Sequence, residues 1–264
     1  MTNSPDRTGA SGAIETPNFA SDDLTELARA RSEAINLVQW LARVAYSYVT
    51  SSALERRTDL EFRAAAAAFV THQFADGVAL EIRLPDLHLQ FLHNGKAVPH
   101  VFDPQERSPA EAEAWILVEL LHRGIDREKF SKKLPYTIPG LLTGDAEDYA
   151  PQDCRKGLIR LTDWFGKGAA VLEAAARARS RDKAEVICLP QTLNLVLAPL
   201  SGASSIPLGF SPGDIENPEP HFYTGGAANP ASPKPSRAIV SASKLLAQGD
   251  AVRAAATLLK MAAA

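Results

Sequence analysis

The chain has 264 residues, of which 45% are hydrophobic and 22% are charged, and its formal net charge is −3. This balance lacks the basic excess that is typical of nucleic-acid-binding proteins, so it argues against that class. The lack of an apolar run of about 18 residues excludes a membrane-spanning helix. Two cysteines are too few for a disulfide framework, and residues 1–21 lack the basic and apolar regions of a signal peptide. We therefore expect a soluble cytoplasmic protein with no nucleic-acid or membrane partner.

The predicted organisation has three parts. Residues 1–21 are rich in Ser, Thr, Gly, Pro and Asn and are expected to form a disordered leader. Residues 22–229 are expected to form one α+β domain, in which antiparallel β-sheet is flanked by two long helices. Residues 230–264 are predicted to be a linker and a C-terminal helical segment, with helices over 236–248 and 250–261.

Three helices are predicted within the α+β domain. The first long helix runs from residues 21–23 to 48–52, because acidic residues lead into apolar ones at helical spacing. A shorter helix begins with Ser108-Pro109-Ala110-Glu111, which combines an N-cap, a first-turn proline and a capping box. The second long helix covers residues 152–179, where Gly166 and Gly168 weaken the middle and predict a kink.

Strands are predicted from alternation and turn residues. Residues 60–71 are ambiguous, because five consecutive alanines favour a helix and Phe69-Val70-Thr71 favours a strand; we interpret them as a strand. The clearest pair, 79–84 and 87–93, flanks a short Pro85-Asp86 turn. Two prolines exclude a helix within 134–139. Further strands or short extended pieces are predicted at 185–189, 192–198, 205–210 and 221–224.

The most distinctive segment is Ser211-Pro212-Gly213-Asp214, with Glu219-Pro220-His221-Phe222-Tyr223 close behind it. Residues 209–213 match the G-x-S-x-G nucleophile elbow, which uses the backbone N–H of the residue after the serine. Pro212 has no N–H, and the prolines that follow exclude the required helix, so we reject a serine-hydrolase elbow. Proline and glycine at the two central positions predict a type II turn instead.

Two kinds of chemistry stay open for this segment. Asp214, Glu216 and Glu219 offer hard oxygen ligands for a divalent cation, although they lack the spacing of a known calcium loop. His221 beside Asp214 or Glu219, with Tyr223 close by, offers the acid–base groups of a metal-dependent or hydrolase-like enzyme. The chain has no Walker loop and no strand-linked G-x-G-x-x-G, which disfavours nucleotide cofactors of those types.

The other histidines and the cysteines give weaker signals. No H-x-x-x-H or C-x-x-C spacing occurs, so spacing gives a zinc site no support. His88 is interpreted as a solvated strand residue, and His122 as a favourable charge at a helix C-terminus. Cys154 falls in a predicted first helical turn, which would lower the pKa of its thiol, although no histidine partner is evident. Cys188 is expected in the core.

Several short segments together resemble a group of uncharacterised bacterial proteins that carry a domain of unknown function. The resemblance covers roughly residues 27–224. It implies an α+β fold with substantial antiparallel sheet and no established activity. It rests on Arg31 with Gln39, Thr58-Asp59-Leu60, Leu134-Pro135-Tyr136 with Ile138-Pro139, and the Ser-Pro-Gly-Asp … Glu-Pro-x-Phe-Tyr segment.

The resemblance also implies ionisable residues that this chain lacks. Asn36 and Arg57 stand where histidines are expected, while Gln191, Thr192 and Asn194 replace two histidines and an aspartate. Amides and hydroxyls are poor metal ligands and poor proton carriers. We therefore expect a ligand-binding or catalytically degenerate domain. The alternatives are the metal-dependent or hydrolase-like enzyme described above and a protein-interaction module that acts through the terminal helices.

Overall fold

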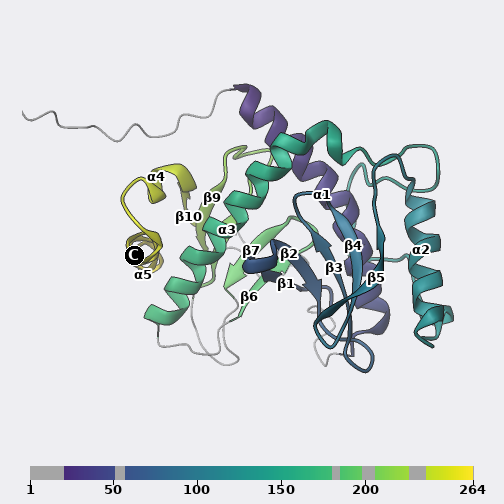
Figure 1. Cartoon of the computed structure of the whole chain (residues 1–264). Coiled ribbons are helices and arrows are strands. Elements are labelled where there is room, and N and C mark those ends of the chain that lie inside the picture. The colour runs from purple at the N-terminus through teal and green to yellow at the C-terminus, as the bar shows by residue number, and fades with distance from the viewer. Residues whose placement is uncertain (1–20, 51–56, 180–184, 198–205, 226–235, 264) are drawn as a thin grey trace, which may run out of the picture.

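The structure is a computed structural model that describes residues 21–50, 57–179, 185–197, 206–225 and 236–263 (Figure 1). The predicted leader, apart from Ser21, and the predicted linker at 230–235 lie outside these residues. The α+β class is confirmed, since an antiparallel sheet is accompanied by two long helices and by helices at the C-terminus. Every helix in the described part is too short or too polar to cross a membrane.

A ten-stranded antiparallel sheet has the order β10-β9-β8-β7-β6-β1-β2-β3-β4-β5 (Figure 1). It consists of two five-stranded meanders, β1–β5 and β6–β10, which join where Leu60 of β1 pairs with Cys188 of β6. The strands are β1 (Leu60–Arg63), β2 (Ala68–Thr71), β3 (Val78–Arg83), β4 (His88–His93), β5 (Lys96–Phe102), β6 (Val186–Leu189), β7 (Asn194–Leu197), β8 (Leu208–Ser211), β9 (His221–Gly225) and β10 (Ser236–Ser241).

The two long helices α1 and α3 pack against each other and against the sheet (Figure 1). Their close approach depends on Gly157, because a Cβ there would lie 2.9 Å from the Cβ of Ala30. The helices are α1 (Ser21–Tyr48), α2 (Pro109–His122), α3 (Arg155–Ala178), α4 (Ala242–Leu246) and α5 (Ala251–Ala263), with short 3-10 turns η2 (Ala64–Ala66), η3 (Arg127–Lys129) and η4 (Pro151–Cys154).

Aromatic rings connect the two meanders through α3. Centroid separations of 5.2, 5.0, 6.0 and 5.3 Å link Phe62, Phe69, Phe165, Phe210 and Phe222 in that order. Each such pair adds about 0.5–1.5 kcal/mol beyond the burial of its surface. The α3 helix continues through both of its central glycines, and Gly168 leaves the space that the Phe210 ring fills, with a built Cβ only 2.6 Å from that ring. Gly168, which was predicted to weaken the helix, therefore allows a close packing contact with Phe210.

The single strand predicted over residues 60–71 is wrong in one respect. The segment forms a hairpin, β1 and β2, whose turn is the 3-10 turn η2. The helical preference of the alanine run is satisfied by this one turn, which ends at Ala67 in the left-handed conformation with φ 48°. Phe62 and Phe69 pair across the hairpin, so burial of their rings holds the flanking residues in the sheet.

The helix predicted over residues 236–248 is also wrong in its first half. Residues 236–241 form β10, which pairs with β9, and α4 begins only at Ala242. Ile239 and Val240 lie opposite Tyr223 and Phe222, a pairing that suits β-branched side chains in a sheet. Sheet pairing to a distant strand therefore overrides the local helical pattern.

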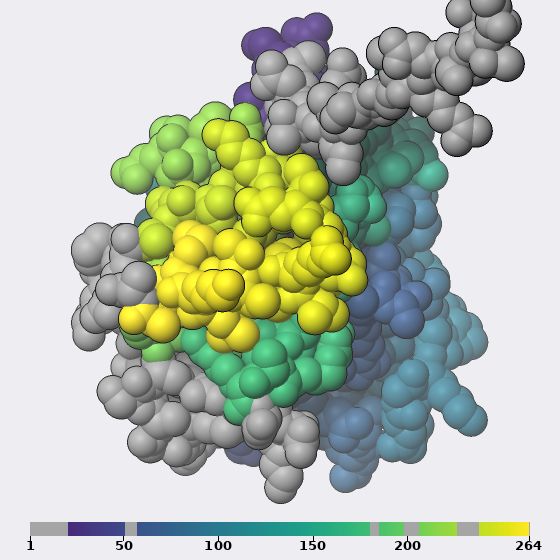
Figure 2. Space-filling view, turned by 90° about the vertical axis from the view of Figure 1, so that its left-hand side faces the viewer, coloured from purple at the N-terminus to yellow at the C-terminus, as the bar shows by residue number. Residues whose placement is uncertain are grey.

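The predicted C-terminal helix is confirmed as α5. Figure 2 shows α5, in yellow, lying across the green α3 helix on one side of the molecule. Contacts to α3 and β9 accompany this placement. Ala254, Ala255 and Leu258 are buried there, so the apolar face of α5 is used by the protein's own core.

Candidate metal site

The α2 helix ends with three ionisable side chains that share its last turn. Its start is held by the predicted capping box, in which Ser108 Oγ accepts from the Glu111 amide and the Glu111 carboxylate accepts from the Ser108 amide. Glu119 and His122 are three residues apart and therefore lie on the same side of the helix. Arg123 follows directly as the C-cap residue.

The neighbouring strand β5 carries a bulge that local sequence patterns do not predict. Residues 98–100 of β5 lie between the pairs Gln90–Val101 and Leu92–Ala97, opposite one residue of β4. Pro99 has no N–H for the ladder, and His100 adopts a left-handed φ of 74°. The Gln90 side chain donates to the Val98 carbonyl at 2.6 Å, which gives a carbonyl within the bulge a hydrogen-bond partner.

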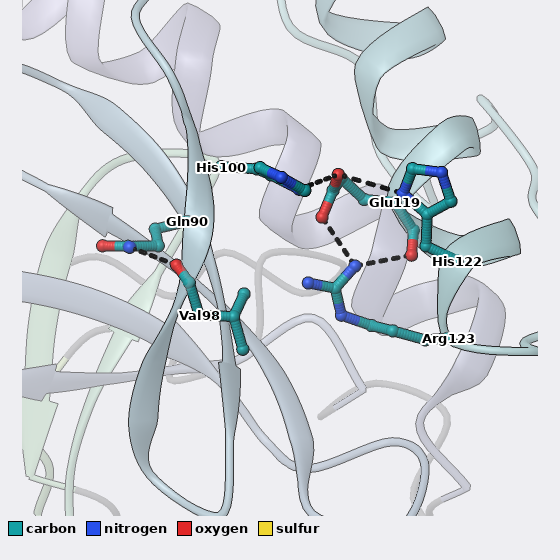
Figure 3. A network of polar contacts seen from close by, with 6 residues as sticks. All are labelled: Gln90, Val98, His100, Glu119, His122 and Arg123. Atoms are coloured by element: carbon teal, nitrogen blue, oxygen red, sulfur yellow. Dashed lines mark hydrogen bonds and ion pairs between the residues drawn. The ribbon is translucent and has the colours of Figure 1, made fainter.

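The bulge brings His100 to the last turn of α2 (Figure 3). His100 Nδ1 lies 3.2 Å from Glu119 Oε1, and His122 Nδ1 lies 3.5 Å from the same oxygen. One ligand atom from each of the three residues lies within 4.8 Å of the others. In the part of the chain that the structure describes, this is the only group of three or more His, Cys, Asp or Glu side chains that converges in this way. We call these three residues the His–Glu–His cluster.

Arg123 fixes the orientation of the central carboxylate. Its Nη1 donates to Glu119 Oε2 at 2.7 Å and to the Glu119 carbonyl at 2.6 Å, while its guanidinium carbon lies 4.3 Å from the centroid of the Phe91 ring. Only 3% of the Glu119 side chain is exposed, whereas the two imidazoles are largely exposed. Oε2 is thus held from inside the protein, and Oε1 faces the two histidines.

The His–Glu–His cluster lines open space. A cavity of about 520 Å³ is bounded by its three residues together with Val98 and Pro99. A second cavity of about 670 Å³, next to Tyr48 and Phe74, shares His93 and Arg123 with the first. Both volumes are in the range of small-molecule sites, about 300–1,000 Å³.

Part of this cluster can be read from the sequence. Glu119-x-x-His122 within a well-capped helix is a spacing that metal-binding helix bundles use, and it differs from the H-x-x-x-H and C-x-x-C spacings that this chain lacks. His100 cannot be found in this way, because its position depends on the bulge. His122 does lie at a helix C-terminus as predicted.

The most distinctive sequence segment, residues 211–223, which we call the SPGD loop, folds against α1. Gly213 has the positive φ, 107°, that a type II turn requires at that position. The Asp214 amide, however, donates to the Asn217 carbonyl at 2.9 Å rather than back across the predicted turn. Arg31 of α1 donates to the Pro212 carbonyl at 3.4 Å, and burial lowers the pKa of its guanidinium, with nearby Asp214 opposing that shift.

Two of the predicted catalytic residues of the SPGD loop lie near each other. Buried His221 places Nε2 3.8 Å from Asp214 Oδ2, and its Nδ1 lies 2.9 Å from the Glu219 carbonyl. Glu219 itself accepts from the Ser241 hydroxyl at 3.0 Å. Glu216 is exposed, and the loop carboxylates are not part of a converging group of ligand atoms within the described residues.

The Tyr223 ring lies beside the His221 ring, with centroids 6.4 Å apart, and its hydroxyl is directed toward β7. Asn194 Nδ2 donates to its hydroxyl at 3.4 Å, and burial raises the pKa of that phenol. Asn194 is one of the positions where the resemblance implies an ionisable residue. Its amide therefore has a structural contact in this chain.

A second such position, Asn36, joins a buried polar network at the centre of α1. Asn36 Oδ1 accepts from the Leu142 amide at 2.8 Å. Gln39 donates to the Pro190 carbonyl at 2.8 Å and accepts from the Tyr136 hydroxyl at 3.0 Å. Burial raises the pKa of Tyr136, so the phenol stays a neutral hydrogen-bond donor.

Two side chains next to this network have buried polar atoms that are less well hydrogen-bonded. Gln191 Oε1 and Arg57 Nε are buried without a hydrogen-bond partner among the described residues. The resemblance thus points at a region whose amides mostly hold backbone and side-chain groups in place. Whether a site was lost there stays a prediction.

The two cysteines differ from reactive thiols. Burial, followed by the charge of Glu33, raises the pKa of Cys154 to about 11, so the predicted lowering by a helix start is outweighed. Cys188 is fully buried in β6, which confirms its predicted core position, and burial raises its pKa well above the ordinary value. Neither thiol is available as a ready metal ligand at neutral pH.

Comparisons with models of protein families, with curated proteins and with solved structures find no match for this chain. Similarity to a protein of known activity therefore contributes nothing to the choice of function. The proposed function therefore rests on the positions and chemistry of the side chains.

Proposed function

We propose that this protein binds a divalent transition-metal ion, with Zn²⁺ the best match, through His100, Glu119 and His122. The observation that carries the proposal is the convergence of one ligand atom from each residue within 4.8 Å. Two imidazole nitrogens and one carboxylate oxygen form a ligand set typical of zinc sites that keep a position open for water or substrate. The exposed side of the cluster and its adjoining cavity suit such an open site.

Contacts behind the ligands support the same interpretation. Metal-binding carboxylates are usually held by a further hydrogen bond, and such outer contacts are typically worth about 10–100-fold in affinity. Arg123 supplies that contact at Glu119 Oε2, while Oε1 faces the two histidines, where an ion would bind. The alternative is that the three side chains only link β5 to α2 through ion pairs, with no metal involved.

A direct test compares metal binding by the intact chain and by single variants, without a histidine tag and in a buffer that does not bind metal. Titration calorimetry with Zn²⁺ should give one tight site in the wild-type chain. His100→Asn and His122→Asn should each weaken that site by more than the roughly 10–100-fold expected for an outer contact, since each removes a ligand.

The matched control is His88→Asn, because His88 is also partly exposed and also lies beside a carboxylate, 3.6 Å from Asp103, but belongs to no converging group of ligand atoms among the described residues. This variant should bind Zn²⁺ like the wild type. Equal binding by all four proteins, or no binding by any, would leave only the ion-pair interpretation of the cluster.

A further inference from the structure

We infer that the metal-loaded His–Glu–His cluster binds an organic anion, whose oxyanion group coordinates the metal and accepts hydrogen bonds from Arg123. This inference rests on the proposed metal site and names the class of ligand that would complete it. Carboxylates and phosphates share the required chemistry, which is an oxygen carrying negative charge next to a cation and a guanidinium.

Local charge is the first argument. A divalent ion and Arg123 together bring three positive charges, while Glu119 brings one negative charge and the neutral imidazoles bring none. Two positive charges therefore stay uncancelled beside a largely buried carboxylate. An anion entering the open coordination position removes part of this imbalance, and a neutral ligand does not.

The free edge of Arg123 is the second argument. Both of its contacts to Glu119 use Nη1, and among the described residues Nε and Nη2 donate to no protein acceptor. Arg123 lines both cavities, and Figure 3 shows its guanidinium lying between Glu119 and the Val98 side chain. An oxyanion on the metal would thus have unused N–H donors within the same cavity.

The shape and lining of the cavities decide where the organic part lies. The smaller cavity has apolar walls at Val98 and Pro99 next to the three ligands. The larger one carries Asp76 and the Asp126–Lys129 pair, whose nitrogen and oxygen lie 4.0 Å apart. The additional carboxylate of Asp76 disfavours a second anion, so the charged head belongs at the metal and the apolar body against Val98 and Pro99.

Cobalt substitution separates this inference from the metal site itself. Co²⁺ in place of Zn²⁺ gives a visible absorption spectrum that changes when a new ligand enters the metal's coordination sphere. The Co²⁺-loaded chain, in chloride-free buffer, is titrated with benzoate, phenyl phosphate, acetate and inorganic phosphate. Benzoate and phenyl phosphate should change the spectrum in a saturable way, at least ~10-fold more tightly than acetate and inorganic phosphate, because only they bury an apolar body.

A charge-changing pair of variants checks the location of the anion. Val98→Glu places a negative charge on the wall of the smaller cavity, while the bulge keeps its contact to Gln90, which uses the Val98 backbone. It should keep Co²⁺ binding, with a changed spectrum if the new carboxylate enters the open coordination position, and should lose at least ~10-fold in anion affinity. Val98→Gln, of similar size and neutral, should lose much less.

The outcomes are distinct. If no Co²⁺ spectrum forms, the proposed metal site is wrong. If the spectrum forms but none of the four anions changes it, metal binding stands and the anion inference is wrong. If acetate and inorganic phosphate bind as tightly as the aromatic anions, or if Val98→Glu has no effect, the apolar body does not occupy the cavity, which overturns the inference. Tighter binding by benzoate or by phenyl phosphate supports it and identifies the head group.

Discussion

The His–Glu–His cluster and the SPGD loop use polar side chains in opposite ways. In the cluster, side chains meet other side chains across two elements and face open space. In the loop, side chains mostly bind backbone: Arg31 binds the Pro212 carbonyl, Ser211 Oγ accepts from the Gly213 amide, and Asp214 Oδ1 accepts from the Asn217 amide. A conspicuous sequence motif can therefore consist of the residues that one backbone turn needs in order to form.

Among the substitutions that test this difference, Gly213→Ala is expected to have the largest effect on stability. A Cβ there would lie 2.7 Å from Arg31 Nη1 and even closer to the Pro218 carbonyl, at a φ of 107°. We expect a loss of about 3 kcal/mol in the free energy of unfolding, measured by urea denaturation, with Zn²⁺ binding unchanged in the folded fraction.

The matched control is Gly95→Ala, which also has a positive φ, 76°, but has nothing within 4 Å of a built Cβ. It should cost only about 1–2 kcal/mol, the penalty of the left-handed conformation. Equal losses in the two variants would mean that the SPGD loop is not tightly packed against α1.

An intermediate effect is expected from Arg123→Gln. This change leaves the buried Glu119 carboxylate without its closest cation, and we expect a loss of about 2 kcal/mol in the free energy of unfolding. Excess Zn²⁺ should recover part of it in thermal melts, because an ion bound to Glu119 and the histidines restores a positive partner and stabilises the folded state.

Arg31→Gln provides the comparison for the loop. It removes a side-chain contact to a carbonyl, 3.4 Å long, that no metal can replace. Its melting temperature should respond to Zn²⁺ as the wild type does. If Zn²⁺ restored the melting temperature of Arg31→Gln as much as that of Arg123→Gln, the effect of the ion would not be specific to the His–Glu–His cluster.

The smallest effect concerns Glu33, which accepts a hydrogen bond from the Ala150 amide at 2.7 Å and so resembles the loop in binding backbone. Burial raises the pKa of this carboxyl, with the Ala150 hydrogen bond opposing that shift. A raised pKa means that the folded state binds the proton more tightly than the unfolded chain does. The contribution of Glu33 is therefore most favourable below the unfolded pKa and is lost as pH rises through the folded pKa.

Glu33→Gln removes this pH dependence. Its melting temperature should slightly exceed that of the wild type at neutral pH, and the difference should vanish as the pH falls below the pKa of an unfolded glutamate, about 4.3. Scanning calorimetry at several pH values measures it. A difference that grows on acidification would mean that folding lowers the pKa of Glu33 instead of raising it.

Much of the fold follows from local signals in the sequence. The capping box at Ser108, the apolar spacing of α1 and the alternation in β4 each predicted an element that the structure contains. Where prediction was wrong, as at residues 236–241, the deciding interaction is pairing with a strand that local patterns cannot specify. The order of the two meanders depends on one such distant pairing, between β1 and β6.

Only part of the candidate site can be predicted in the same way. Glu119 and His122 are neighbours by helical geometry alone, so their spacing is readable. His100 reaches them because a proline, a left-handed residue and the Gln90 side chain together distort an outer strand. Those three features form a bulge only once β4 is in place, which sequence spacing does not reveal.

The same bulge has a consequence for how molecules of this protein meet one another. Strand β5 ends the sheet, and a regular outer strand offers unpaired N–H and C=O groups to which another chain can add. Pro99 removes a donor there, and the left-handed turn at His100 breaks the straight line that an added strand would need. The bulge that brings the three side chains together thus also disfavours the addition of another chain's strand to β5, and with it aggregation. A metal ion that linked β5 to α2 would disfavour this addition further.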